Sequence, residues 1–242
     1  MIFEENNIFK HVKNYDNQIY DSAGFVAHEK YMMLVTSFNI FSLNFSELKN
    51  FIETMNNPQV ILEIMKIENR SKHNDVGLLL QRVFSNYLNS ALMLVDHARN
   101  FTKTYDAECE LKVKYVERIK NEFAGNELHR FIQCMRAYMF HYRLPITSQK
   151  VQFSKENITQ TISLSKGSLL TYDSWNKEAK KWIETQDEEI PLLRFTTDYF
   201  EKVKTFYEWF FCEISLYHAG DFEKTNQLIK LCEDLLTNKP NV

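Results

Sequence analysis

The stretch NDVGLLLQRVFSNYLNSALMLVDHARNFTKTY, residues 74–105, decides the fold because it predicts one long amphipathic helix. Side chains of one face recur along it at three- and four-residue intervals, which is the spacing of an α-helix. This stripe consists of Leu78, Leu79, Arg82, Val83, Asn86, Tyr87, Ser90, Leu94, His97 and Phe101. A helix of this kind is stable only when its apolar face packs against other elements, so a helical bundle is expected.

Similar patterns continue on both sides of this helix. Upstream, residues 45–55 predict a short helix and Pro58 suits the first turn of another that runs towards Glu68. Residues 30–35 fit either a strand or the start of a helix. Downstream, Asp106 can cap a helix over Leu111, Tyr115, Ile119 and Phe123, and Gly125-Asn126 ends it. A third helix is predicted from Glu127 to just before Leu144-Pro145, because Pro145 disfavours a helical residue before it.

The pattern then changes to alternation, which predicts a small antiparallel hairpin or meander at about residues 149–172, with turns at residues 154–157 and 165–167. Asp173 or Ser174 can cap a helix containing Trp175 and Trp182, Pro191 opens a long one, and a last helix follows Gly220. The expected fold class is mainly α: an antiparallel helical bundle with a small inserted β element. Residues 1–70 are interpreted as an N-terminal extension packed on a helical domain of residues 71–242.

Composition and charge limit the functions open to the chain. Its 242 residues carry a formal net charge of −3 and are 44% hydrophobic, which is typical of a globular protein with a large core. This charge argues against a protein that coats nucleic acid non-specifically, so RNA contact would need a local basic patch. Between residues 126 and 155 Glu127 is the only acidic residue. The basic residues of that window are Arg130, Arg136, Arg143, Lys150 and Lys155, together with His129 and His141.

Cysteine usage and the apolar segments point to the cytoplasm. Cys109, Cys134, Cys212 and Cys232 are widely spaced and fit reduced thiols better than a disulfide framework or a zinc site. The N-terminus lacks the basic and apolar regions of a signal peptide. The most apolar stretch, residues 31–43, is too short and too polar to cross a bilayer. We therefore expect a cytoplasmic protein with no membrane segment, and no motif calls for a metal or a cofactor.

Arg136 and His141 form the candidate catalytic pair, as an R-x4-H pattern near the end of the third predicted helix. Over five helical residues the chain rises about 7.5 Å and turns about 140°, so the two side chains flank a stretch of surface. Histidine can accept or donate a proton at neutral pH, and arginine can hold a phosphate and the charge that develops on it. The spacing alone is a weak signal.

The surrounding segment resembles the HEPN superfamily, whose signature is R-x4-6-H at the end of a bundle helix. The matching residues are Phe131, Ile132, Arg136, Tyr138, His141, Leu144, Pro145 and Ile146. Residues 90–99 also look like the companion helix, and the resemblance extends over roughly residues 75–235. It implies a metal-independent ribonuclease in which a symmetric homodimer brings two Arg–His pairs to one RNA. It also implies a toxin–antitoxin or phage-defence setting, with an antitoxin or defence-complex protein as a further partner.

The resemblance also assigns supporting residues and exposes two departures. Residues expected to bind RNA or support the site are Ala137, Tyr138, Tyr142, Arg143, Arg130, His97 and Arg99. The family usually has a polar residue, often Asn, at the position of Ala137. This indicates a weakened or inactive member, or an engineered replacement, and leaves open a non-catalytic module for dimerisation and for partner or nucleotide binding. Members modified by a nucleotidyltransferase carry Tyr two residues after the histidine, where this chain has Arg143.

Overall fold

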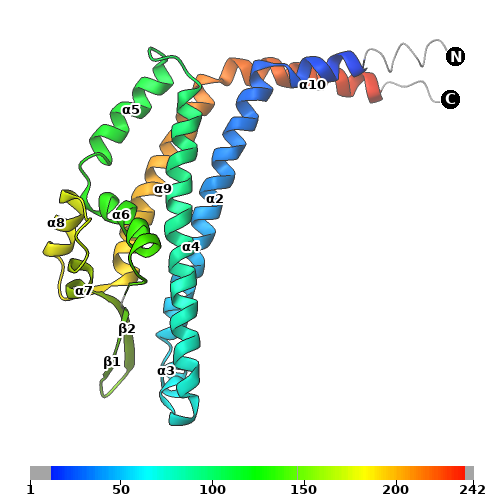
Figure 1. The fold of residues 1–242 in the computed structure, drawn as a ribbon. Coiled ribbons are helices and arrows are strands. Elements are labelled where there is room, and N and C mark those ends of the chain that lie inside the picture. Colours follow the sequence, from blue (N-terminus) through cyan, green and yellow to red (C-terminus); the bar gives the residue numbers. More distant parts are fainter. Residues whose placement is uncertain (1–11, 146, 238–242) are drawn as a thin grey trace. The chain divides into compact units, whose positions relative to one another are not determined.

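The computed structural model describes residues 12–145 and 147–237, without the side chains of residues 70–73, and is mainly helical with one small antiparallel sheet (Figure 1). The helices are α2 (Ala23–Met55), α3 (Pro58–Met65), α4 (Arg70–Lys103), α5 (Glu110–Glu122), α6 (Glu127–His141), α7 (Lys166–Leu170), α8 (Lys177–Thr185), α9 (Leu192–Tyr217) and α10 (Ala219–Thr237), and residues 12–20 are also helical. A 3-10 turn spans Ile67–Asn69, and the strands are β1 (Thr147–Phe153), β2 (Ile158–Ser165) and β3 (Glu189–Pro191). The predicted mainly α fold with a small antiparallel β element is confirmed.

The chain forms two compact units. Of the described residues, 12–36 group with 207–237, and the larger unit lies within Ser37–Phe206, so α2 and α9 contribute to both. In the smaller unit α2 approaches α10 closely at Gly24, where a Cβ atom would collide with the carbonyl oxygen of Asp221. The boundary expected at residue 70 stays a prediction, although residues 37–70 belong to the same unit as most of the predicted helical domain.

The core of the larger unit lies where α4 packs against α2 and α9 (Figure 1). The ring of Phe41 on α2 lies 5.4 Å from that of Tyr87 on α4, measured between centroids. Tyr87 is fully buried, and its hydroxyl donates a 3.0 Å hydrogen bond to the carbonyl oxygen of Thr196 on α9. The long helix predicted from the repeating stripe is therefore confirmed, and the stripe faces the core at Tyr87.

An aromatic cluster fixes α6 in the larger unit. Phe131 stacks on Trp182 with ring centroids 4.1 Å apart, and Tyr138 stacks on Trp175 at 5.5 Å. Phe131 and Tyr138 have no exposed surface, because they lie on the face of α6 that contacts α8 and the segment before it. This packing leaves the opposite face of α6, which carries Arg136 and Phe140, towards solvent.

The inserted β element is a hairpin extended by one short strand. β1 and β2 pair antiparallel from Thr147 with Leu164 to Phe153 with Ile158, which confirms the predicted hairpin. The third strand is β3, whose Ile190 pairs with Leu164 of β2. It lies well beyond residue 172, where the β element was predicted to end. Residues 165–167 were expected to form a turn, but Ser165 caps the short helix α7, since its hydroxyl accepts from the backbone N–H of Ser168.

Helix boundaries were predicted less well than helix positions. Asn57 and Asn126 accept hydrogen bonds from the first turns of α3 and α6, in agreement with the expected breaks. Asp106 does not cap α5, which begins after Cys109. Asn176, rather than Asp173 or Ser174, caps α8. Residues 30–35, which fitted a strand or a helix, lie inside the long helix α2.

The four cysteines are free thiols, and Cys212 is exposed whereas Cys232 is buried. Among the residues that the structure describes, no helix combines the length and the apolar character that crossing a lipid bilayer requires.

Candidate functional site

Arg136 projects from the solvent-facing side of α6 and is held at one edge of its guanidinium. Its Nε donates a 3.2 Å hydrogen bond to Oδ1 of Asn89 on α4, and its Cζ lies 5.0 Å from the ring centroid of Phe140. The Nη groups make no hydrogen bond to any residue that the structure describes. Two contacts therefore orient the guanidinium, and its terminal nitrogens stay available for a ligand.

His141 is the last residue of α6 and is exposed. Within the described part of the chain its imidazole makes no hydrogen bond or ion pair. Arg136 is also exposed, so both members of the predicted pair are accessible to a ligand. Helical geometry separates them by about 7.5 Å along the axis of α6, with their directions about 140° apart.

A groove of about 580 Å³ opens beside Arg136, between α2, α4 and α6 of the larger unit. Its lining combines neutral amides and apolar groups with one cation and one carboxylate. The residues are Ile40, Asn44, Asn86, Asn89, Ser90, Leu92, Met93, Asp96, Arg136 and Phe140. The ring of Phe140 is 57% exposed although it borders this groove. The arrangement can accept a ligand that has both an anionic part and a flat polar part.

Sequence reasoning missed the amides of this groove, above all Asn89, which orients Arg136. A signal was present, since Asn86, Asn89 and Asp96 follow one another at spacings of three and seven residues. Such spacing places them along one side of a helix. The prediction of a core stripe alone does not separate a buried polar residue from one that lines a groove.

Arg143 lies just beyond α6, where it ties the end of that helix to α7. Its Nε donates to the Tyr138 hydroxyl at 2.9 Å, and its Nη2 donates to the Ser168 carbonyl and hydroxyl oxygens at 2.9 and 2.8 Å. The hydrogen bond to Tyr138 is the main reason why the pKa of Arg143 is raised above its ordinary value. Arg143 and Tyr138 thus hold the helix end, and a direct contact of Arg143 with RNA would compete with these bonds.

Tyr142 and Ala137 complete the predicted set near the end of α6. Tyr142 is exposed, its hydroxyl lies 3.4 Å from Oγ1 of Thr171, and the guanidinium of Arg143 lies 5.2 Å from its ring centroid. Ala137 is half-buried and lies one helical turn before His141. A longer polar side chain at residue 137 could therefore reach towards the imidazole, whereas the methyl group of alanine cannot form a hydrogen bond.

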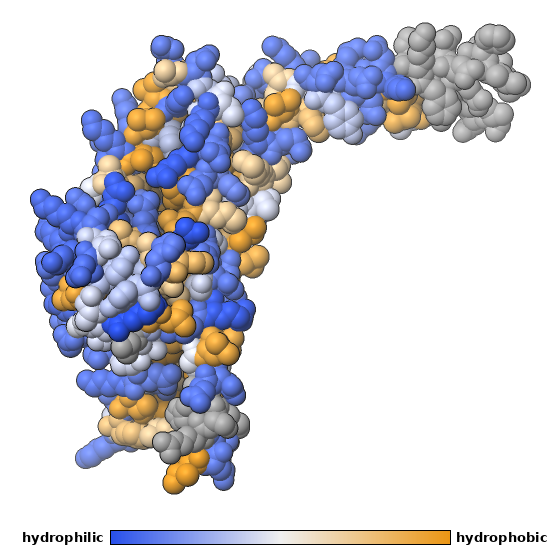
Figure 2. All heavy atoms as spheres, viewed as in Figure 1, coloured by the Kyte–Doolittle hydropathy of each residue, from blue (hydrophilic) through white to orange (hydrophobic). Residues whose placement is uncertain are grey.

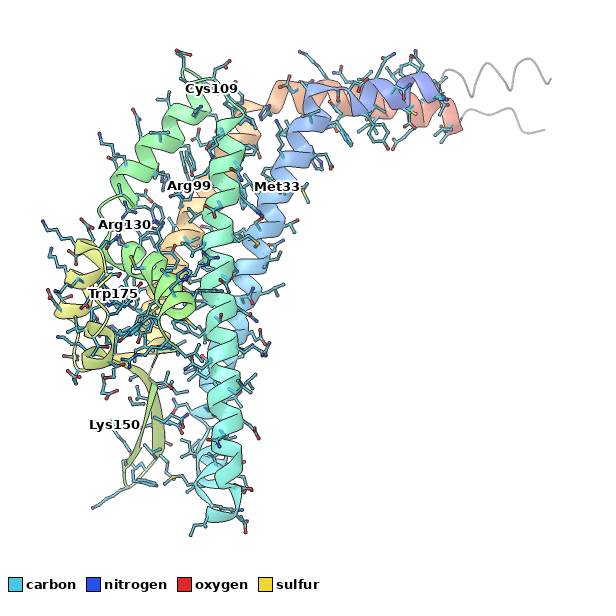
Figure 3. All side chains as sticks on the ribbon, viewed as in Figure 1. Met33, Arg99, Cys109, Arg130, Lys150 and Trp175 are labelled. Carbon is cyan, nitrogen blue, oxygen red and sulfur yellow. The ribbon has the colours of Figure 1, made fainter. Side chains whose placement is uncertain are left out.

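Arg130 lies at the other end of α6, near the loop from α5. Its Nε and Nη2 donate to the carbonyl oxygen of Ala124 at 3.3 and 3.1 Å, and its Nη1 donates to Gln133 at 3.0 Å. Figure 3 labels Arg130 at the start of α6 and Arg99 on α4. Arg99 forms an ion pair with Asp96, in which Nη1 and Oδ1 are 3.5 Å apart.

Arg99 on α4 and Arg130 on α6 both lie near the buried His129, at the first end of α6. Burial, together with the positive charges of Arg130, Arg99 and Lys202, lowers the pKa of His129 from 6.5 to about 4. The helix rises about 18 Å between residues 129 and 141, so these two arginines lie far from His141. On the same helix α4, Nδ1 of His97 lies 2.5 Å from the hydroxyl oxygen of Ser37 on α2.

The predicted site residues therefore separate into three groups. Arg136 and His141 share the exposed end of α6, Tyr138, Tyr142 and Arg143 bind that end to α7, and His97, Arg99 and Arg130 lie elsewhere. The remaining basic residues of the predicted patch, Lys150 and Lys155, lie on the β hairpin and the turn that follows β1. Hydrophilic residues predominate on the face seen in Figure 2, over α6 and α8.

The chain matches no protein-family model, no curated protein and no solved structure.

Proposed function

We propose that this protein is a metal-independent endoribonuclease of HEPN type, with Arg136 and His141 as its catalytic residues. The observation that carries the proposal is that a fixed cation and an imidazole, both exposed, share the last turns of α6. Arg136 is also pre-oriented by Asn89, which lowers the entropy lost when it binds an anion. The motif block around these residues supports the family, and the formal net charge of −3 restricts RNA contact to a local basic site.

The reaction uses only proton transfer and charge stabilisation. His141 takes the proton from a ribose 2′-hydroxyl, whose oxygen then attacks the adjacent phosphorus. The P–O5′ bond breaks as the P–O2′ bond forms, which leaves a 2′,3′-cyclic phosphate, and the 5′ oxygen takes a proton from a second acid. Arg136 holds the phosphate and stabilises the charge that develops on its oxygens.

A homodimer would supply the second acid. One chain contributes one imidazole at this position, whereas the reaction needs a base and an acid. Two copies related by a twofold axis that passes near the end of α6 would bring two Arg136–His141 pairs to one phosphate. Under this proposal one His141 acts as the base, and its equivalent in the second copy acts as the acid.

Ala137 decides how active this chain is expected to be. Asparagine at this position could hydrogen-bond to the imidazole or to the scissile phosphate, so Ala137→Asn should increase RNA cleavage by roughly tenfold or more. The test compares cleavage of a labelled single-stranded RNA, and growth inhibition on expression, for the natural chain, Ala137→Asn and Ala137→Asn with His141→Ala. If none of the three cleaves RNA or slows growth, the nuclease proposal is wrong.

A second function, a catalytically inactive module that dimerises and binds a partner or a nucleotide, is favoured by one observation. Ala137 removes the polar side chain one turn before His141 but leaves Arg136 and the groove beside it intact. Such a module would bind a nucleotide without cleaving RNA, and its dimer would persist in the His141→Ala variant.

The resemblance to the HEPN superfamily also suggests the biological role of the protein and its partner. We propose a cytoplasmic toxin or phage-defence effector, restrained by an antitoxin or by a protein of a defence complex. Co-expression with the products of neighbouring genes would test this: an antitoxin should abolish growth inhibition by the Ala137→Asn chain, and a bystander protein should leave it unchanged.

A further inference from the structure

The groove beside Arg136 is lined by more polar and apolar groups than phosphate binding requires. A phosphate needs a cation and hydrogen-bond donors, which Arg136 provides at one edge. The rest of the groove presents three asparagines, Asn44, Asn86 and Asn89, among apolar residues. This lining resembles what holds a flat heteroaromatic ring, because amides supply donors and acceptors and apolar groups contact the faces of the ring.

We propose that this groove binds one unpaired nucleobase, with the phosphate attached to that nucleotide held by Arg136. The inference rests on the proposed function for the position of the phosphate, and it adds the substrate class: single-stranded RNA with a base turned out of the stack. Base edges in an A-form duplex lie in a deep, narrow groove that side chains do not read, so a paired base cannot enter a groove of this kind.

The amide groups that would contact the base differ in the hydrogen bonds that they already make within the protein. Asn89 uses its Oδ1 to accept from Arg136, and the Nδ2 of Asn44 donates to the carbonyl oxygen of Ile40 in its own helix. Asn86 is half-buried on α4 and makes no hydrogen bond to any residue that the structure describes. Asn86 therefore has both its donor and its acceptor available for the base, and Asn44 has its carbonyl oxygen.

The ionic groups orient the nucleotide in one direction. Asp96 lines the groove as well as Arg136, and its carboxylate pairs with Arg99. A carboxylate repels phosphate and can accept from an exocyclic amino group of a base. The phosphate is thus expected at Arg136 and the base towards Asn86 and Asp96. The exposed ring of Phe140 already carries the Arg136 guanidinium over one face, and its other face can stack on a neighbouring base.

The test measures the affinity of the full chain for a short labelled RNA whose 2′-hydroxyls are methylated, so that no 2′-oxygen can attack and binding is separated from cleavage. Asn86→Leu with Asn44→Leu should weaken binding roughly tenfold, because two uncharged contacts are lost. The slope of log affinity against log salt should stay unchanged. Arg136→Ala should weaken binding and reduce the magnitude of that slope by about 0.7, since one phosphate contact is lost.

Matched controls separate the groove from the rest of the surface. Asn39→Leu on α2 and Asn100→Leu on α4 replace exposed asparagines outside the groove, and they should bind as the natural chain does. Asn86→Gln keeps the amide and should restore most of the affinity. The same RNA annealed to its complement should bind more weakly than the single strand.

The outcomes distinguish this inference from the proposed nuclease. Equal affinity of the Asn86→Leu, Asn44→Leu double variant and of its controls overturns the base-binding groove, whether or not RNA is cleaved. Loss of affinity in the double variant, together with no cleavage of unmodified RNA by the Ala137→Asn chain, supports the groove and rejects the nuclease. A mononucleotide that competes at the same concentration as the RNA identifies a free nucleotide as the source of the bound base, and a single strand that competes at far lower concentration identifies RNA.

Discussion

The two ends of α6 each carry an arginine and a histidine, yet the structure uses them in opposite ways. At the first end His129 is 7% exposed and its Nδ1 lies 3.1 Å from the Tyr199 hydroxyl, while Arg130 binds the loop carbonyl of Ala124. At the last end Arg136 and His141 are exposed. The comparison teaches that burial, rather than residue type or spacing, separates a histidine that packs in the core from one that a ligand can reach.

Replacing each histidine in turn should give the largest difference between the two ends of α6. His141→Ala should lower the rate of RNA cleavage by about 10²- to 10⁴-fold, because a positioned proton donor or acceptor contributes on that scale. The measurement is single-turnover cleavage of labelled RNA by the Ala137→Asn chain, with and without the change at residue 141.

His129→Gln in the same background is the matched control. Glutamine can still hydrogen-bond to the hydroxyl of Tyr199 but does not titrate, so the cleavage rate of folded protein should change little. Equal losses from the two substitutions would show that the two ends of α6 do not differ as we infer.

The second prediction concerns the pH dependence of stability. The pKa of His129 is about 4 in the folded protein, against about 6.5 when it is exposed to water. Between these values the unfolded chain binds a proton and the folded chain does not, so the free energy of unfolding falls as the pH falls from 6.5 to 4. Above this range both states are neutral and the stability is fully present. The loss reaches about 3 kcal/mol at its largest.

Urea unfolding at several pH values measures this effect. In His129→Gln the free energy of unfolding should depend less steeply on pH between 6.5 and 4, because the contribution of His129 is lost. In His141→Ala the pH dependence should be the same as in the parent chain. A natural chain and a His129→Gln variant with identical pH profiles would contradict a buried, neutral His129.

Periodic patterns predicted the positions of the helices well, because side-chain spacing records which face of a helix is buried. The buried positions of α6 and of the middle of α4 follow from it, as does the hairpin of β1 and β2, whereas Leu78 and Leu79 of the predicted stripe are exposed. The starts of α5 and α8 were wrong because several nearby polar side chains can each cap a helix, and only packing selects one. Ile146, one of the motif residues, lies outside the described residues.

The candidate site was predictable only in part. Arg136 and His141 could be named because they lie close together in sequence on one helix. The contact of Arg136 with Asn89 joins residues 47 positions apart, and local spacing gives no information on such a pair. The sequence also grouped Arg99, Arg130 and Arg143 with the site, since charge alone does not show which arginine is already bound by carbonyl or hydroxyl oxygens of the protein itself.

The third prediction compares the arginines of the two ends. Arg136→Lys keeps the positive charge but loses the planar fork and the contact of Nε with Asn89, so RNA cleavage should fall roughly tenfold. Arg130→Lys should leave cleavage unchanged and lower the melting temperature, because Arg130 makes its hydrogen bonds to Ala124 and Gln133. A larger loss of cleavage in Arg130→Lys would move the RNA contact to the first end of α6.

The smallest expected effect tests whether structural and chemical roles also separate within the last end of α6. Tyr138→Phe removes the hydroxyl that accepts from Arg143 but keeps the fully buried ring in its stack on Trp175. The free energy of unfolding should fall by about 1 kcal/mol, which is the usual net value of one intramolecular hydrogen bond. Cleavage should stay within about twofold of the parent, because the Tyr138 hydroxyl is buried and bound to Arg143 rather than placed at the RNA. If stability were unchanged and cleavage lost, the Tyr138 hydroxyl would act on the RNA, and the chemistry would extend from the solvent-facing side of α6 to the side that packs on α8 and the segment before it.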